Sequence, residues 1–293
     1  MATATGTVRE ALGAAAEAMA AAGIEDPRLD AEVLLAAASG RQRAALLADG
    51  SAGIEPAAAR RFGELVRRRL RREPVAYIVG RRGFRRLELA VDRRVLVPRP
   101  ETELLVEVAL ELRPARALDV GTGSGAIALA LADELPAAEV VATDTSPGAL
   151  AVARANAERL GLAERVRFLP GTLPAGEREF DLVLANLPYV AERDWPTLQP
   201  EVTQWEPREA LLAGPDGLDA YRAFFAPGGC LFLGMAKGKT TAGGDSEGKT
   251  TTVAVEVGEG QAEAVGELVR EAGWSEVETR RDLVGIERVV IGR

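Results

Sequence analysis

The fold is decided by the stretch Leu118-Asp119-Val120-Gly121-Thr122-Gly123-Ser124-Gly125, which leads into an apolar, alanine-rich run over residues 126–132. This order predicts a buried strand, a glycine-rich loop and a helix. Glycines at such a junction allow the backbone to turn sharply and to approach a ligand at the N-terminus of the helix. The loop alone does not identify that ligand, because Gly121, Gly123 and Ala126 also fit the pattern G-x-G-x-x-A of dinucleotide-binding folds.

Alternating strand and helix patterns surround this loop. We expect helices from about residue 126 and from residue 146, and strands over residues 117–120, 140–143, 166–169 and 180–185. Such alternation is typical of a parallel sheet with helices on both faces. Residues 277–279 and 287–291 are separated only by a short polar turn, which permits antiparallel pairing. The sequence therefore predicts an α/β, Rossmann-like fold with a mostly parallel sheet and a C-terminal antiparallel hairpin.

The N-terminal third has a different pattern. From Val8 to Leu70 apolar residues recur three and four positions apart, which predicts a small all-α domain. Two β-like runs follow, at residues 84–89 and 95–97, and predict a β-hairpin linker. We therefore expect three parts: the helical domain over residues 1–74, the linker over 75–98 and the α/β domain over 99–293.

The composition excludes several classes of chemistry. The 293 residues include no histidine and one cysteine, so imidazole catalysis, a disulfide framework and a histidine or thiolate metal site are not expected. With 44 acidic and 36 basic residues the net charge is −8, which argues against broad attraction to nucleic acid or to an anionic membrane. The N-terminal segment carries Arg9, Glu10 and Glu17 and is predicted to be a helix, not a membrane span. We infer a soluble protein in a reducing, cytoplasmic setting.

One segment departs from the surrounding composition. Residues 236–252 consist almost entirely of glycine, lysine, threonine, serine and acidic residues, which predicts a surface loop between two strands. Residues 243–250 also fit the phosphate-binding pattern G-x-x-x-x-G-K-T. We reject that function here, because a phosphate loop requires a strand before it and a helix after it.

Two carboxylates flank the glycine-rich loop. Asp144 ends the second expected strand of the sheet, where a carboxylate accepts hydrogen bonds from ribose hydroxyls. Asp119 stands directly before the glycines, where it would repel a pyrophosphate but attract a cationic ligand. Together with the expected C-terminal hairpin, these positions favour S-adenosylmethionine over a nicotinamide dinucleotide.

The tetrapeptide Asn186-Leu187-Pro188-Tyr189 follows an expected strand, at the sheet edge where open α/β folds bind ligands. The Asn186 side-chain oxygen and the Leu187 carbonyl each accept one N–H, while Tyr189 offers a stacking face. This chemistry suits a planar NH2 group, as in glutamine or adenine. Because an amide nitrogen is a poor nucleophile, we expect alignment with the methyl donor, rather than an ordinary general base, to carry catalysis.

Five motifs, in this order, resemble the release factor glutamine N5-methyltransferases, the HemK-like family. They are Glu73-Pro74-Val75-Ala76-Tyr77-Ile78-Val79-Gly80, Val97-Pro98-Arg99-Pro100-Glu101-Thr102-Glu103, the loop over 119–125, the tetrapeptide, and Glu206-Pro207-Arg208 with Gly214-Pro215-Asp216-Gly217-Leu218. The resemblance covers nearly the whole chain. It implies a class I methyltransferase fold that transfers a methyl group from S-adenosylmethionine to the glutamine side-chain amide of the Gly-Gly-Gln motif in peptide chain release factors.

The resemblance also implies roles for parts of the chain. Residues 1–74 become a substrate-recognition domain and residues 99–293 the cofactor-binding methyltransferase domain. The implied catalytic residues are Asn186, Leu187, Pro188 and Tyr189. The implied cofactor-binding residues are Asp119, Gly121, Thr122, Gly123, Ser124, Gly125, Asp144, Leu173 and Asn186, with Thr172 beside Leu173 at the adenine. Leu187 replaces the proline usual in the family, but Pro188 still biases it toward extended conformations.

Other functions remain open at this stage. An N6-adenine methyltransferase uses a similar tetrapeptide, although aromatic residues, which stack flipped bases, make up only 4% of this chain. A noncatalytic release factor or ribosome binding protein is a further alternative. Residues 60–86 contain eleven arginines and two glutamates, which indicates either a solvated helix face or a surface that steers an acidic release factor. We expect a monomer whose partner is the release factor, without direct nucleic acid specificity or membrane binding.

Overall fold

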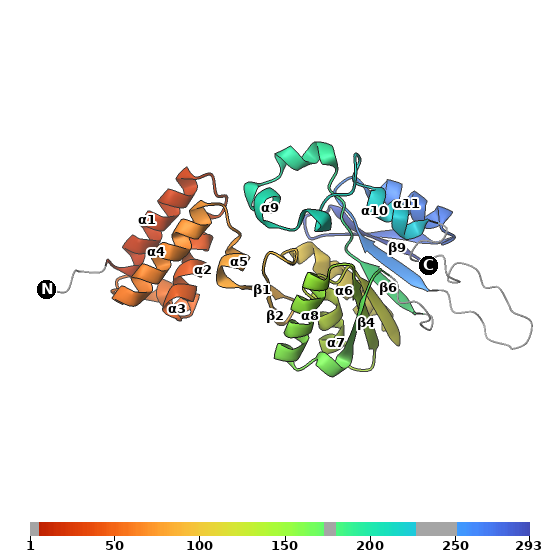
Figure 1. Ribbon diagram of the computed structural model, residues 1–293, viewed down its shortest axis with the longest axis horizontal. Coiled ribbons are helices and arrows are strands. Elements are labelled where there is room, and N and C mark those ends of the chain that lie inside the picture. The colour runs from red at the N-terminus through yellow and green to blue at the C-terminus, as the bar shows by residue number, and fades with distance from the viewer. Residues whose placement is uncertain (1–5, 173–179, 227–250) are drawn as a thin grey trace, which may run out of the picture. The chain divides into compact units, whose positions relative to one another are not determined.

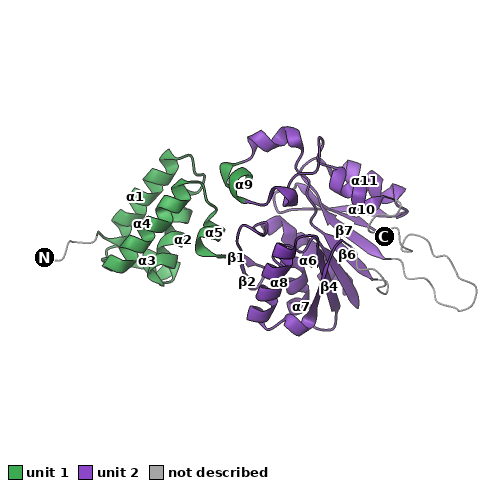
Figure 2. Cartoon of the chain, viewed as in Figure 1, with its two compact units in different colours: residues 1–81, 199–205 green, residues 82–198, 206–293 purple. Residues whose placement is uncertain are grey.

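The computed structural model describes residues 6–172, 180–226 and 251–293, and the chain forms two compact units. Unit 1 comprises residues 1–81 and 199–205, and unit 2 comprises residues 82–198 and 206–293 (Figure 2). Residues 199–205 were not expected to pack with the N-terminal helices. The three-part division at residues 74 and 98 stays a prediction.

Unit 1 is built from short helices around one apolar core. Its helices are α1 (Val8–Ala21), α2 (Pro27–Ser39), α3 (Arg43–Ala48), α4 (Pro56–Leu70), α5 (Val75–Val79) and α9 (Pro200–Trp205). Thr7 begins α1 through a capping box, in which its hydroxyl accepts from the Glu10 backbone N–H and Glu10 accepts from that of Thr7. Leu12, Leu35 and Phe62 share the core that holds the helices together.

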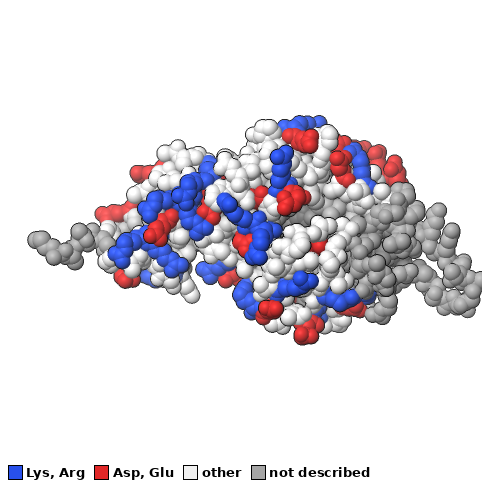
Figure 3. Space-filling model, in the orientation of Figure 1, with Lys and Arg blue, Asp and Glu red and all other residues white. Residues whose placement is uncertain are grey.

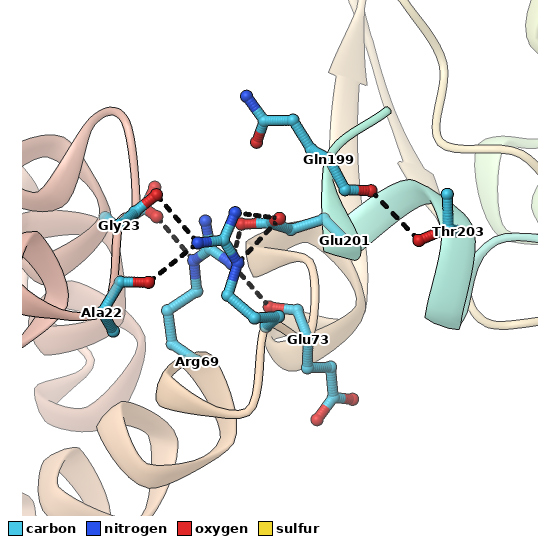
Figure 4. A network of polar contacts seen from close by, with 9 residues as sticks. Ala22, Gly23, Arg69, Glu73, Gln199, Glu201 and Thr203 are labelled. Atoms are coloured by element: carbon cyan, nitrogen blue, oxygen red, sulfur yellow. Dashed lines mark hydrogen bonds and ion pairs between the residues drawn. The ribbon is translucent and has the colours of Figure 1, made fainter. Parts of the chain in front are cut away.

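Helix α9 is attached to unit 1 by charge. The Glu201 carboxylate lies 2.7 Å from Nη1 of Arg69 and accepts hydrogen bonds from Nε and Nη2 of Arg72, at 2.9 and 2.6 Å. Figure 4 shows the Arg69 and Glu201 side chains pointing toward each other. Arg72 also donates to the carbonyls of Ala22 and Gly23 at 2.9 and 2.8 Å. Residues distant in sequence thereby satisfy each other's buried charges.

Unit 2 contains one seven-stranded sheet within the described ranges. Its strands are β3 (Arg116–Val120), β4 (Glu139–Asp144), β5 (Val166–Pro170), β6 (Leu182–Ala185), β7 (Thr252–Glu256), β8 (Val277–Arg281) and β9 (Glu287–Gly292). The order is β5-β4-β3-β6-β7-β9-β8, and Figure 1 labels β4, β6 and β9 of this sheet. Strands β3 to β7 are parallel, while β9 is antiparallel to both β7 and β8. The predicted α/β fold with a C-terminal antiparallel hairpin is confirmed.

Helices cover both faces of this sheet. They are α6 (Glu103–Leu112), α7 (Ala126–Glu134), α8 (Pro147–Leu160), α10 (Asp219–Phe225) and α11 (Ala262–Glu271), with 3-10 turns η1 (Pro100–Thr102), η2 (Ala163–Arg165), η3 (Glu192–Thr197) and η4 (Arg208–Ala210). Alternate strand residues face opposite ways. Ala117 and Leu182 pack with α6 and α7, whereas Leu118 and Val183 pack with α10 and α11. Burial on both faces explains the continuous apolar strands.

The predicted β-hairpin before the sheet is confirmed, but its strands begin and end at other residues than expected. Its strands are β1 (Arg81–Phe84) and β2 (Leu87–Ala90), so the expected strand at 84–89 contains the turn and residues 95–97 lie outside any strand. Arg85 adopts a left-handed φ of 51°, which ionic contacts hold in place: its Nε and Nη2 donate to Glu134 at 3.0 Å. The Val97 N–H donates to Glu206 instead of to a strand partner.

The predicted loop at 236–252 ends earlier than expected. Thr252 already belongs to β7, and the buried Thr251 hydroxyl donates to the Phe180 carbonyl at 2.7 Å. The rest of that prediction, residues 236–250, lies outside the described residues. Within the part of the chain that the structure describes, none of the helices has the length and apolarity needed to cross a bilayer.

Candidate active site

A cavity of about 600 Å³ opens at the carboxyl ends of β3, β4, β5 and β6. The order of the strands reverses between β3 and β6, which is where open α/β sheets bind ligands. Val120 pairs with Ala185 in the ladder, so Gly121 and Asn186 leave the sheet side by side. Predicted site residues that line the cavity are Gly121, Thr122, Gly123, Ser124, Asp144, Thr172, Asn186, Leu187 and Pro188. Leu173 lies outside the described residues.

The glycine-rich loop is held against β4 by its backbone. The N–H groups of Gly121 and Thr122 both donate to the Thr143 carbonyl at 2.9 Å. Gly125 begins α7 with a φ of 86°, and a Cβ there would lie 3.3 Å from the Ala153 Cβ and 2.9 Å from Leu129. A side chain at this position would therefore strain the backbone and separate α7 from α8. Gly125 supports the loop without lining the cavity.

Asp119 lies beneath this loop, fully buried. Its Oδ2 accepts from the Thr122 hydroxyl at 2.6 Å and from the Ala128 N–H at 3.1 Å, while Oδ1 has no partner among the described residues. Burial raises the pKa of Asp119 to about 7, although these two hydrogen bonds lower it. A cationic ligand above the loop would favour the ionised form, so the unsatisfied oxygen fits a sulfonium cofactor.

Asp144 lies at the end of β4 and lines the cavity. Its Oδ2 accepts from the Gly123 N–H at 2.9 Å, and its Oδ1 accepts from the Ser146 N–H at 2.8 Å. A carboxylate has about four acceptor positions, so two remain for ribose hydroxyls. The same side chain therefore fixes the loop and presents acceptors to the cavity.

Residues 186–188 of the tetrapeptide line the cavity, whereas Tyr189 packs against the core. Asn186 Nδ2 donates to the Thr102 hydroxyl oxygen at 3.0 Å, and no described residue donates to Asn186 Oδ1. Leu187 lines the cavity and also packs against the core. The Tyr189 ring packs into that core beside Gly258, and burial raises its pKa to about 12. Contact between Tyr189 and a substrate therefore stays a prediction.

Three residues without a predicted role support the site. Thr102 belongs to the motif at residues 97–103. Glu256 is the last residue of β7, the strand that follows the tetrapeptide in the sequence. Asn156 is fully buried on α8, where Nδ2 donates to the Ala90 and Ser124 carbonyls and Oδ1 accepts from the Ala90 N–H. An asparagine on the apolar face of the predicted helix was the signal for this contact between the hairpin and the glycine-rich loop.

Two of the quoted motifs meet beside the cavity. Arg99 Nη2 contacts Glu206 Oε1 at 2.6 Å, and Glu206 Oε2 accepts from the Val97 N–H at 3.3 Å. The Glu206 side chain is only 2% exposed, so the pair is largely removed from water. The motifs at 97–103 and 206–208 are therefore linked structurally, and Arg99 forms part of the cavity wall.

Comparisons with known proteins agree with this geometry. A family model described as the PrmC N-terminal domain matches residues 10–80, and one described as a methyltransferase domain matches residues 117–205. The release factor glutamine methyltransferase of Geobacter sulfurreducens is 42% identical over 98% of this chain and 96% of its own length. That of Moorella thermoacetica is 45% identical over 91% of each chain.

Among solved structures, the catalytic domain of hMettl16 in complex with MAT2A 3′UTR hairpin 6 covers 70% of this chain and 74% of its own, with 15% identity and a TM-score of 0.53. A likeness at this identity shows a shared fold alone. The sequence relatives, in contrast, match along almost their entire length. The chain therefore belongs to the release factor glutamine methyltransferases, the family that its motifs predicted, and is an enzyme that depends on S-adenosylmethionine.

Proposed function

We propose that this protein methylates the side-chain amide nitrogen of the glutamine in the Gly-Gly-Gln motif of a peptide chain release factor. The observation that carries the proposal is the fixed amide of Asn186. Because Nδ2 donates to Thr102, Oδ1 is left as an acceptor at the cavity wall, beside the glycine-rich loop. The full-length relatives named release factor glutamine methyltransferases support this choice of substrate. Such a substrate implies action in the cytoplasm.

The chemistry follows from how the tetrapeptide holds an NH2 group. Bound S-adenosylmethionine supplies an electrophilic methyl group. Asn186 Oδ1 and the Leu187 carbonyl accept the two N–H groups of the substrate amide, which fixes the direction of the nitrogen lone pair. As the methyl C–N bond would form, its C–S bond would break and leave a neutral thioether, so positive charge would move from sulfur to the nitrogen, where both acceptors would stabilise it. One of the amide protons then leaves to water, so no imidazole is required.

Cofactor binding is assigned to residues at the carboxyl ends of β3 and β4. Asp144 accepts from the ribose hydroxyls, while the backbone at Gly121 and Gly123 allows close approach of the amino acid portion. Asp119 contributes negative charge from beneath the loop. Thr172 is assigned to the adenine, together with the predicted Leu173.

Recognition of the release factor is assigned to the exposed arginines of α4 and to its C-cap residue Arg71. Arg60, Arg61, Arg67 and Arg71 are exposed and form no ion pair with any described residue. Figure 3 shows basic side chains gathered over the helices of unit 1 on this face. Unpaired guanidinium groups attract an acidic surface and increase the rate of association. We therefore propose that the release factor presents acidic residues to α4.

The test is mass spectrometry of a release factor incubated with the protein and S-adenosylmethionine. We expect the mass of one methyl group on the Gly-Gly-Gln glutamine, and none on a release factor whose glutamine is replaced by asparagine. Asn186→Ala should abolish methylation while cofactor affinity changes by no more than a few-fold, on the order of one lost hydrogen bond. Normal turnover by Asn186→Ala would contradict the assignment.

A parallel reaction with an adenine-containing oligonucleotide separates the remaining alternatives. Methylation of the oligonucleotide instead of the release factor would identify a nucleic acid methyltransferase. Cofactor binding without any methylated product would identify a noncatalytic binding protein.

A further inference from the structure

A buried carboxylate lies behind the side chain that defines the proposed reaction site. Asn186 Nδ2 donates to the Thr102 hydroxyl oxygen at 3.0 Å, and hydrogen bonding by the Thr102 side chain lowers the pKa of the neighbouring Glu256 carboxylate. We infer that Thr102 and Glu256 are positioning residues, which together fix the Asn186 amide so that Oδ1 faces the substrate nitrogen. This inference rests on the proposed function, because it takes Asn186 as the residue that binds the substrate amide.

The sheet register brings the three residues together. Ala185 of β6 pairs with Val255 of β7, so Asn186 and Glu256 follow paired residues on neighbouring parallel strands. Thr102 reaches them from the start of α6, at the end of η1. Thr102 is 4% exposed and Glu256 1% exposed. The contacts therefore form in a space from which water is largely excluded.

The direction of the hydrogen bonds follows from what each group can do. An asparagine NH2 can only donate, so the Thr102 oxygen must accept from it. The single hydroxyl proton of Thr102 is then free to go to the carboxylate. A flipped Asn186 amide would place two acceptors against each other and leave its NH2 toward the cavity. The Thr102–Glu256 pair therefore disfavours the flipped orientation, which could not accept a substrate N–H.

Packing alone does not account for an acid at residue 256. Oε2 of Glu256 has no hydrogen-bond partner among the described residues. The Tyr221 hydroxyl, which lies beside it, donates to the backbone carbonyl of Glu256 instead, at 2.7 Å. An unsatisfied buried carboxylate is unfavourable, and an apolar side chain would fill the space without that penalty. What the acid adds is negative charge behind Thr102, which polarises the chain and strengthens Asn186 Oδ1 as an acceptor.

Several charged groups around Glu256 decide whether it is ionised. Burial, and to a smaller extent the nearby Glu101 carboxylate, raises its pKa to about 7. The Thr102 hydrogen bond and the guanidinium groups of Arg288 and Arg99 lower it. The phenols of Tyr189 and Tyr221 stay neutral, because burial raises the pKa of each. The carboxylate therefore forms as the pH rises through neutrality, and turnover at saturating cofactor should rise with it.

The first experiment compares Thr102→Val, Thr102→Ser and Glu256→Gln by kcat, KM and cofactor Kd. Thr102→Val removes the acceptor with little change in shape, and we expect kcat to fall about tenfold, as for one lost orienting hydrogen bond, with cofactor Kd nearly unchanged. Thr102→Ser should restore most of kcat. Glu256→Gln should abolish the rise of kcat with pH near 7. Wild-type turnover in Thr102→Val, or an unchanged pH profile in Glu256→Gln, would overturn the inference.

Thr251→Val is the matched control. Thr251 is also a buried threonine of unit 2, and its hydroxyl donates to the Phe180 carbonyl at the opposite end of β7. Its replacement should lower stability by a similar amount but leave kcat and its pH profile unchanged. A merely structural role for Thr102 would instead give the two valine variants the same kinetics.

A second measurement does not depend on methyl transfer. The sequence contains only two asparagines, Asn156 and Asn186, so asparagine labelled with ¹⁵N in its side chain gives two NH2 signals. We expect the Asn186 signal to shift as the pH passes through about 7 in the wild type but not in Glu256→Gln, whereas the Asn156 signal stays constant. An Asn186 signal without this titration would overturn the inference. This titration tests the link between Asn186 and Glu256 without any methyl transfer. If the wild type methylated no release factor, the proposed function alone would be refuted.

Discussion

The two units treat their buried carboxylates in opposite ways. In unit 1, burial would raise the pKa of Glu201, but the hydrogen bonds from Arg72 and Arg69 hold it below its usual value (Figure 4). In unit 2, Asp119 and Glu256 form no ion pair with any residue that the structure describes, and burial raises the pKa of each to about 7. Pairing thus separates carboxylates that hold the fold from carboxylates that change charge near neutral pH.

Within unit 1, the pKa of a buried carboxylate also varies with the number of arginines that contact it. Asp30 accepts one hydrogen bond from Arg69, at 2.6 Å, and shares that arginine with Glu201. Burial raises the pKa of Asp30, and the single partner does not offset this completely. The pKa therefore lies below its usual value for Glu201, which two arginines contact, and above its usual value for Asp30, which one arginine contacts.

The largest effect is expected from removing the fully paired acid. Glu201→Ala leaves the buried Arg69 with Asp30 as its remaining carboxylate partner and removes the carboxylate that pairs with Arg72, and we expect a loss of about 3–5 kcal/mol in the unfolding free energy of unit 1. This loss is measured by denaturant unfolding that is monitored through hydrogen exchange of the α1–α4 amides. The pair Arg281–Glu287, in which the arginine is exposed and the glutamate partly exposed, provides the control, since Glu287→Ala should change stability by no more than about 0.5 kcal/mol. Equal effects of the two substitutions would show that burial adds nothing to the pair.

An unpaired acid should affect ligand binding instead. Asp119→Asn removes negative charge beneath the cofactor, and we expect S-adenosylmethionine affinity to fall about tenfold at pH 8. Wild-type affinity should rise between pH 6 and 8, as Asp119 loses its proton, while that of the variant should not. Isothermal titration calorimetry measures both. If the cofactor affinity of Asp119→Asn still rose between pH 6 and 8, a group other than Asp119 would be responsible for the titration.

The sign for stability is the reverse of the sign for binding. The pKa of Asp119 is about 7 in the folded state, compared with an ordinary value of 3.8. The folded protein therefore binds this proton more tightly than the unfolded chain. The resulting contribution to stability is complete below the unfolded pKa and is lost as the pH rises through 7. Cofactor-free wild type should therefore lose more thermal stability from pH 5 to 8 than Asp119→Asn does. Glu256 contributes in the same direction, because its pKa is also raised. Thermal unfolding with and without cofactor separates these effects.

Arginines of α4 and of its C-cap repeat the comparison within one helix. Arg69 is buried and paired, whereas Arg60, Arg67 and Arg71 are exposed. Replacing these three exposed arginines with glutamine should slow association with the release factor several-fold at low salt and leave stability nearly unchanged. Stopped-flow binding across a salt series measures the rate. A salt-independent wild-type rate would argue for a solvated helix face without a steering role.

The smallest effect is expected at Leu187. Its backbone carbonyl, rather than its side chain, is assigned to the substrate, and Pro188 already favours an extended conformation there. Leu187→Pro should therefore change kcat by no more than about twofold, in the direction of higher activity. Steady-state kinetics on the release factor measures it. A large loss would show that the leucine side chain shapes the cavity.

Local sequence patterns predicted the features that depend on few residues. The glycine-rich loop, the parallel strands and the position of Asn186 after β6 follow from apolar runs and their boundaries. The roles of Thr102 and Glu256 could not be predicted, because they require the β6–β7 register and the approach of η1. The hairpin was predicted, but its strands were misplaced by a few residues, because its turn contains Arg85, a left-handed residue whose side chain bonds the distant Glu134. Long-range contacts of this kind leave no local periodicity.

The noncontiguous composition of unit 1 restricts how this protein can be recombined. A fragment that ends at residue 81 would lack α9, and with it the carboxylate that neutralises Arg69 and Arg72. Exchange of the helical unit between relatives therefore has to include residues 199–205, although they are encoded within the other unit. A graft limited to the N-terminal residues would need a compatible glutamate already present in the recipient. A helical unit with this ion-pair network is therefore specified by two separate stretches of the sequence.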